Sequence, residues 1–151
     1  MRCDKSCRTR QRTPSLGSLV QDSAYHNRYC GPGALSIITG HSTQCTAHTA
    51  REVSGRLMIT GLAEIDIRDA LFKYGYMSNR ERLEKGITLA RWLRERSPEQ
   101  RKNLYLIRCG HHYVVVKGNK LCDNWTEDPV FIRKAPHRRK RMQSVYRVFV
   151  Y

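Results

Sequence analysis

Cys30 occupies the position in this chain that best suits covalent chemistry. It opens the segment CGPGALSIIT (residues 30–39), in which Pro32 fits a first helical turn and the following apolar residues have helical spacing. The start of a helix presents unpaired backbone N–H groups and the positive end of the helix dipole, and both stabilise a thiolate or an oxyanion. We therefore expect Cys30 to be a nucleophile at the tip of a helix.

Two histidines far along the chain could supply the base for this nucleophile. His111 and His112 begin a β-branched segment, residues 111–117, which predicts a strand. Gly118-Asn119 predicts a two-residue hairpin turn into a second strand at 120–125. In that register Val115 faces Cys122, and the side chains of each strand alternate between the two faces.

The alternation pairs each histidine with a different polar residue. His112 and Asp123 share the more apolar face, which we expect to pack on the helix that Cys30 opens, whereas His111 and Asn124 share the other face. Asp123 would accept the Nδ1–H of His112 and leave Nε2 to take the proton of Cys30. We prefer the triad Cys30–His112–Asp123 and keep His111 with Asn124 as the alternative.

The elements around these residues change their period along the chain. Helical spacing dominates up to residue 96, and alternation dominates from residue 103 onward. Helices followed by antiparallel strands indicate an α+β domain. The expected helices cover residues 30–39, 46–58, 63–74 and 87–96, and the expected strands cover 103–108, 111–117, 120–125 and 144–151.

The chain is strongly basic, with 28 Lys and Arg against 13 Asp and Glu and a formal net charge of +15. This excess predicts attraction to polyanions such as nucleic acid, of a non-specific kind because no base-reading motif accompanies it. Residues 1–20 are expected to form a flexible basic arm ahead of a domain at 21–151, and residues 133–142 form a basic segment within that domain. The candidate polyanion-binding residues are Arg133, Lys134, Arg138, Arg139, Lys140 and Arg141.

The six cysteines favour neither disulfides nor a metal site. The start MRCDKSCRTRQRTPSLG lacks the apolar core of a signal peptide, so reduced thiols in a cytosol are expected. No close Cys/His pair follows Cys3 and Cys7 in a zinc-finger pattern, so we expect no metal and no cofactor. No apolar run approaches the roughly 20 residues that span a bilayer. Cys45, Cys109 and Cys122 are expected to be small buried hydrophobes.

The order of these motifs resembles papain-like cysteine peptidases. Cys-Gly-x-x-Ala-Leu at a helix start, then Gly-His-His-Tyr-Val-Val-Val, a tight hairpin and Asp-Asn-Trp follow one another within residues 25–126. The chain is especially similar to the short versions encoded by tailed bacteriophages. The resemblance implies a helical part whose nucleophile helix packs on a C-terminal antiparallel sheet, a protein or peptide substrate, and a location in the host cytoplasm or the virion, with virion proteins as further candidate partners.

The resemblance also assigns roles to residues. It implies Cys30 as nucleophile, His112 or His111 as general base and Asp123 as the orienting acid. The family often places a Gln six residues before the nucleophile to complete the oxyanion hole, but this chain has Ala24 there. The nearest polar substitutes for that Gln are Asn27 and Gln21.

Two functions from different classes fit these observations. The first is a cysteine peptidase, or a related thiol-dependent acyl-transfer enzyme such as a deamidase, that uses a Cys-His-Asp triad. The alternative is a catalytically inactive papain-like module that acts as a basic structural, virion, nucleic-acid-binding or protein-binding protein. The missing upstream Gln and the net charge of +15 favour the alternative, and thiol reactivity of Cys30 distinguishes the two.

Overall fold

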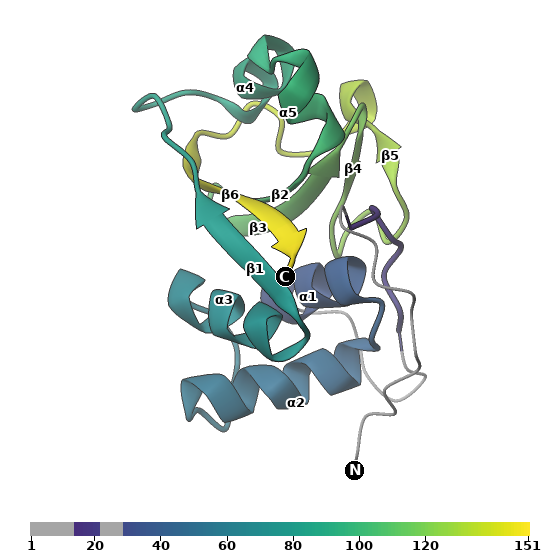
Figure 1. The fold of residues 1–151 in the computed structure, drawn as a ribbon, viewed down its shortest axis with the longest axis vertical. Coiled ribbons are helices and arrows are strands. Elements are labelled where there is room, and N and C mark those ends of the chain that lie inside the picture. The colour runs from purple at the N-terminus through teal and green to yellow at the C-terminus, as the bar shows by residue number, and fades with distance from the viewer. Residues whose placement is uncertain (1–13, 22–28) are drawn as a thin grey trace.

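The computed structural model describes residues 14–21 and 29–151 and shows an antiparallel sheet with helices on both sides (Figure 1). The strands run in the order β1-β6-β2-β3-β4-β5. The helices are α1 (Cys30–Thr39), α2 (Thr43–Ser54), α3 (Glu64–Lys73), α4 (Leu89–Glu95) and α5 (Pro98–Lys102), and the strands are β1 (Tyr76–Arg80), β2 (Leu104–Cys109), β3 (His112–Lys117), β4 (Lys120–Cys122), β5 (Val130–Phe131) and β6 (Met142–Val150). A short 3-10 helix, η1 (Ile132–Lys134), follows β5. The predicted α+β class, with the Cys30 helix packed on an antiparallel sheet, is confirmed.

Helix α1 is the most buried helix of the fold, since every residue after Cys30 is buried. It ends where Gly40 takes a left-handed conformation with φ of 75° and donates its N–H to the Ser36 carbonyl at 2.8 Å. At the other end, a Cβ on Gly31 would lie 2.8 Å from the Cβ of Leu62. Glycine is therefore required for the close approach that fixes the tip of α1 against the loop before α3.

Helix α2 differs from the expected range of 46–58. It begins earlier, because Ser42 caps its first turn by accepting the Cys45 N–H at 3.2 Å, and it ends at Ser54, because Gly55 takes a left-handed conformation with φ of 67°. The early start of α2 therefore reflects the Ser42 cap, which the sequence contains but which the predicted range omits.

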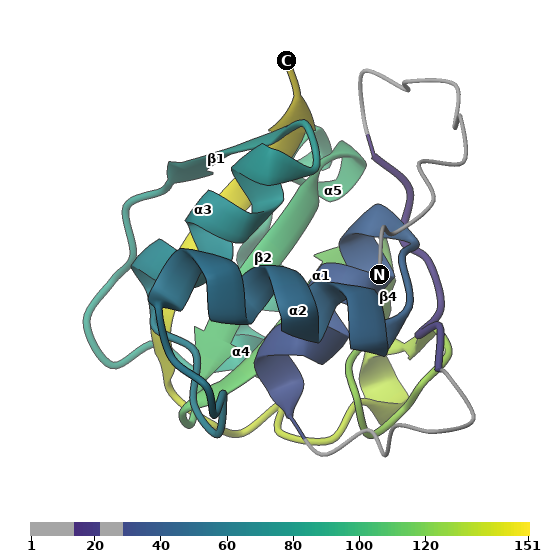
Figure 2. The same ribbon diagram turned by 90° about the horizontal axis from the view of Figure 1, so that it is seen from below.

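Helices α1, α2 and α3 lie together on one side of the sheet, as Figure 2 shows from below.

The predicted hairpin register is confirmed for the central strands. Val115 pairs with Cys122, Val116 with Leu121 and Lys117 with Lys120, as a two-residue turn requires. Strand β4 ends at Cys122 rather than at residue 125 because Asp123 begins a turn. Strand β3 also pairs along its whole length with β2, so His112, its first residue, lies at one end of a central strand.

Besides η1, three elements of the described chain were not expected from the sequence. Strand β1 is short and polar and pairs only with β6 at the sheet edge, and β5 has two residues. Helix α5 begins after Ser97. The sequence places Ser97 just past the end of the expected helix 87–96, but in the structure Ser97 is the N-cap of a new helix. Ser97 forms a capping box with Gln100, and Pro98 occupies the first turn. The sequence SPEQ (residues 97–100) therefore contains the signal for the start of a helix.

The prediction of which sheet face packs on the helices is wrong. Helices α1–α3 cover the face that carries Tyr113, Val115 and Cys122, whereas Val114 and Val116 point into a second core on the other face, beside α4. All these side chains have exposures of 3% or less, so both faces are apolar and covered. A comparison of the hydrophobicity of the two faces could therefore not identify the helix side.

The start of the described chain packs on the domain. Leu16 and Leu19 contact the core beside α1, Val20 donates its N–H to Ser36 Oγ at 3.0 Å, and Lys117 Nζ donates to the Pro14 carbonyl at 3.0 Å. Residues 14–20 therefore pack against the domain, while residues 1–13 of the expected arm lie outside the described residues, and the boundary at residue 20 stays a prediction. Within the described ranges, no helix combines the length and the apolar character needed to cross a bilayer.

Candidate active site

Cys30 lies at the first residue of α1 and contacts the first residue of β3. Tyr29, the N-cap residue, makes no side-chain cap bond, so within the described residues no side chain caps the backbone N–H groups of Cys30 and Gly31 at the helix tip. Burial alone raises the pKa of the Cys30 thiol, but hydrogen bonds with the His112 side chain and the Tyr113 backbone, together with the His112 charge, lower it below its ordinary value. The surroundings of Cys30 therefore favour the thiolate.

His112 connects the thiol to a carboxylate. Its Nε2 lies 2.9 Å from Oδ2 of Asp123, and the two side chains are 12% and 0% exposed. Burial alone lowers the pKa of the His112 imidazole, but hydrogen bonds to Asp123 and Cys30 and the charges of both residues raise it to about 9. A lowered thiol pKa beside a raised imidazole pKa favours a thiolate–imidazolium pair at neutral pH.

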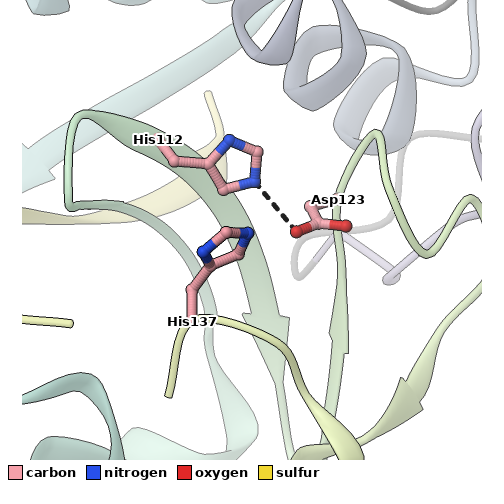
Figure 3. Close-up of side chains that lie close together, drawn as sticks. All are labelled: His112, Asp123 and His137. Atoms are coloured by element: carbon pink, nitrogen blue, oxygen red, sulfur yellow. Dashed lines mark hydrogen bonds and ion pairs between the residues drawn. The ribbon is translucent and has the colours of Figure 1, made fainter. Parts of the chain in front are cut away.

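The ring nitrogens of His112 have the reverse of the expected roles. We expected Nδ1 to face Asp123, but Nε2 does, which leaves Nδ1 for Cys30. Figure 3 shows the second ring nitrogen turned away from Asp123. The prediction that α1 packs on the sheet face carrying His112 failed for a related reason. His112 is the first residue of β3 and meets Cys30 at the tip of α1, so the position of its imidazole depends on where the strand begins and not on the alternation of side chains between the two faces.

Asp123 is held by a turn of its own. Its Oδ1 accepts the backbone N–H groups of Trp125 at 3.0 Å and Thr126 at 2.8 Å, so Oδ2 is left for His112. Burial alone raises the pKa of the Asp123 carboxyl, but the hydrogen bond with His112 and those with the backbone outweigh it and the pKa is lowered. A buried carboxylate with these partners stays ionised and fixes the orientation of the imidazole.

His137 is part of this cluster and was missed by the sequence analysis. It comes from the basic segment after η1, with its ring centroid 4.7 Å from that of His112 and 5.1 Å from that of Trp125. Its Nε2 is buried without a hydrogen-bond partner among the described residues, and Figure 3 shows this side of the ring directed at His112 and Asp123. A single histidine among six cations carries no periodic signal, so only the tertiary contact identifies it.

The alternative residues occupy different positions in the structure. His111 is exposed in the β2–β3 turn, with φ of 60°, and only its backbone N–H makes a bond, to Gln143 Oε1. Asn124 is buried beside Asp123. Gln21, one oxyanion candidate, donates its side-chain amide to Glu127 Oε1 at 3.4 Å. Asn27, the other candidate, lies outside the described residues.

The remaining cysteines of the described chain differ from Cys30. Cys109 and Cys122 are fully buried, as expected, and burial raises the pKa of their thiols to about 12 and about 11. Cys45 is half-buried and disulfide-bonded, so the expectation of a free buried thiol is wrong for Cys45. Among the three free cysteines of the described ranges, only Cys30 has a lowered thiol pKa.

The candidate polyanion-binding residues lie around His137. All six are exposed, and among the described residues none of them makes an ion pair with a carboxylate. The Lys140 charge acts on His137 and Cys109, and its side chain lies against Gly110, two residues before His112. The structure thus places unpaired positive charge at the edge of the candidate active site. A separate pocket of about 460 Å³ between Arg80–Gly86 and Met142–Gln143 contains none of the clustered residues.

Comparison with known proteins supports the fold. The sequence matches no protein-family model and no curated protein. Two solved structures are similar to this one: a double-glycine motif protease from an AMS/PCAT transporter in complex with the leader peptide (TM-score 0.55, 12% identity, 91% of this chain and 93% of that chain), and the peptidase domain of Streptococcus ComA, a bifunctional ABC transporter involved in quorum sensing (TM-score 0.53, 18% identity, 88% of this chain and 96% of that chain). The chain has the α+β fold of papain-like cysteine peptidase domains.

Proposed function

We propose that this chain is a cysteine peptidase that uses Cys30 as nucleophile, His112 as general acid and base, and Asp123 as the residue that orients His112. The observation that carries the proposal is the meeting of three side chains from separate elements: a thiol at a helix tip, an imidazole at a strand end, and a carboxylate 2.9 Å from the far nitrogen of that imidazole. The likeness to two peptidase structures supports the same chemistry.

The proposed reaction uses the ion pair from the start. The Cys30 thiolate attacks the carbonyl carbon of a peptide bond, and the oxyanion faces the backbone N–H groups at the tip of α1. His112 donates its Nδ1 proton to the leaving amine, which departs and leaves a thioester on Cys30. The neutral imidazole then removes a proton from water, the hydroxide attacks the thioester, and the thiolate is released as the carboxylic acid forms. Asp123 keeps Nδ1 aimed at the sulfur throughout.

Selective alkylation of Cys30 at low pH tests the proposal. An ordinary thiol, with a pKa of about 8.5, is less than about 1% ionised at pH 6, whereas the Cys30 thiolate would react. Substoichiometric iodoacetamide at pH 6 should therefore label the peptide that contains Cys30, as located by mass spectrometry. Cys30→Ala should abolish that label, and Cys109→Ala should keep it, because Cys109 is buried with a strongly raised pKa. Labelling of Cys30 no faster than in the urea-unfolded chain would favour the inactive papain-like module.

The basic edge of the site suggests the substrate class. We propose that the peptide carries carboxylates beside the bond that is cleaved, because exposed, unpaired cations surround His137, which packs against His112. Their charges would raise the local concentration of an acidic peptide and orient it. One of the two similar structures contains a leader peptide, which is consistent with a peptide in this place.

A charge-reversal pair tests the substrate class. In a peptide library, Arg138→Glu should raise KM for acidic peptides several-fold and leave kcat unchanged, because Arg138 lies outside the triad. Lys120→Glu is the matched control: it has the same charge change, but Lys120 begins β4 and pairs with Lys117 at the opposite end of β3 from His112. Equal effects of the two variants would indicate general attraction to the net positive charge, and loss of RNA binding in Arg138→Glu with unchanged peptide KM would indicate a nucleic-acid partner. Phage origin and virion partners remain predictions from the resemblance.

A further inference from the structure

The cluster behind the nucleophile contains more ligating atoms than a Cys-His-Asp triad needs. His112, Asp123 and His137 each offer one nitrogen or oxygen atom, and these three atoms lie within 4.8 Å of one another. They come from three separate parts of the chain: the start of β3, the turn after β4, and the segment after η1. Figure 3 shows the two rings and the carboxylate converging on one space.

His137 has no role in the proposed peptidase chemistry that explains its contacts. Its Nε2 is buried without a partner among the described residues, although a buried ring nitrogen ordinarily makes a hydrogen bond. Its backbone is in the left-handed region, with φ of 65°, and its carbonyl accepts the Lys140 N–H at 2.8 Å in a tight turn. The turn therefore holds an unpaired nitrogen beside the His112–Asp123 pair.

We propose that His112 Nε2, Asp123 Oδ2 and His137 Nε2 form a zinc site whose occupation switches off the peptidase. Two imidazoles and one carboxylate are a ligand set that suits Zn²⁺ and does not suit Mg²⁺ or Ca²⁺, which prefer oxygen ligands only. Three protein ligands leave a fourth position for water. Trp125, whose ring centroid lies 5.1 Å from that of His137, is 68% exposed, so solvent reaches the edge of this cluster.

Zinc at this position would stop proton transfer without touching the sulfur. The ion replaces the proton on Nε2 of His112, and that proton leaves to solvent, while Nδ1 keeps its proton and its hydrogen bond to the Cys30 thiolate. When the leaving amine needs a proton, Nδ1 cannot give it without forming an imidazolate. The thioester step therefore stalls, while the thiolate remains. This inhibitory role rests on the proposed function, but the metal site itself does not.

Ring signals of the histidines test the site directly. In ¹H–¹³C NMR spectra of the full chain, ZnCl₂ should shift the ring signals of His112 and His137 and leave those of His48, an exposed residue on α2, unchanged. His137→Asn should require at least about tenfold more zinc for the same His112 shift. Asparagine tolerates a left-handed backbone, so the turn is kept. His48→Asn is the matched control and should behave like the unchanged chain. Unchanged His137 signals at saturating zinc would overturn the proposal.

The rate of Cys30 alkylation distinguishes the proposed site from zinc bound directly to the Cys30 sulfur. Zinc bound by His112, Asp123 and His137 should leave the rate of Cys30 alkylation by iodoacetamide within about twofold, whereas zinc bound to the Cys30 sulfur would block alkylation and refute the proposed site. Hydrolysis of any peptide that the chain cleaves should fall with zinc in the unchanged chain, and His137→Asn should need at least about tenfold more zinc for the same loss. If Cys30 is not reactive at all, the proposed peptidase fails, and the ring shifts still decide whether the metal site exists.

Discussion

Replacement of Asp123 by Asn should uncouple His112 from Cys30 while keeping the fold. Oδ1 of Asp123 accepts two backbone N–H groups, from Trp125 and Thr126, and an Asn carbonyl can keep both bonds. The Asn NH₂ group then faces Nε2 of His112, where the carboxylate oxygen was. A doubly protonated ring would place two donors against each other, so the ring must become neutral with its proton on Nδ1. That tautomer cannot accept the proton of a thiol.

The size of the effect follows from the raised pKa of His112. The rise from 6.5 to about 9 corresponds to about 3 kcal/mol in favour of the imidazolium. Hydrogen bonds and charges of Asp123 and Cys30 supply this stabilisation against the opposing effect of burial, and the hydrogen bond to Asp123 is the largest favourable contribution. In Asp123→Asn we therefore expect the pKa of His112 to fall clearly below 9 and kcat to fall about 10³-fold or more; the same change of the orienting Asp in a serine triad lowers kcat about 10⁴-fold.

NMR titration of the ¹⁵N-labelled His112 ring measures this pKa, and the pH profile of iodoacetamide alkylation measures the thiolate. Asp128→Asn is the matched control, because Asp128 is exposed in the same loop and loses the same charge. A pKa of His112 that stays near 9 in Asp123→Asn, or that falls equally in Asp128→Asn, would refute the coupling between Asp123 and the ion pair.

Two further substitutions test how the site is held. Gly31→Ala should lower the free energy of unfolding, measured in urea, by about 1–3 kcal/mol and should slow Cys30 alkylation, because the new Cβ would lie 2.8 Å from the Cβ of Leu62. Gly61→Ala is the control: a Cβ there meets no atom within 4 Å, so both the stability and the alkylation rate should stay unchanged. Glu64→Gln should cost about 1–2 kcal/mol at neutral pH, since the Glu64 carboxylate accepts hydrogen bonds from Ser144 at 2.6 Å and Tyr146 at 2.7 Å. Burial raises the pKa of Glu64 but these bonds and nearby arginines lower it overall, so its stabilisation is present above its ordinary pKa of 4.5 and is lost as the pH falls through the lower folded value. A difference between Glu64→Gln and the unchanged chain that does not shrink from pH 6 to pH 3 would contradict this account.

The sequence alone determined the features that depend on local chemistry. Pro32 and the apolar stripe after Cys30 predict helix α1 with its observed ends, and Gly118-Asn119 predicts the register of β3 and β4. These signals lie within a few residues of the structure that they specify. The α+β order follows for the same reason, because a change from helical to alternating spacing is visible along the chain.

Tertiary structure alone decided how the site is assembled. Both faces of the sheet are apolar, so no count of hydrophobic residues could tell that Tyr113 and Val115 face α1–α3. The choice of Nε2 of His112 as the partner of Asp123 depends on where a strand end meets a helix tip. His137 reaches the site through a turn about 25 residues after His112, the residue whose ring it contacts. Contacts between segments distant in the chain leave no periodic trace in the sequence, because they depend on the path of the backbone and not on the pattern of its side chains.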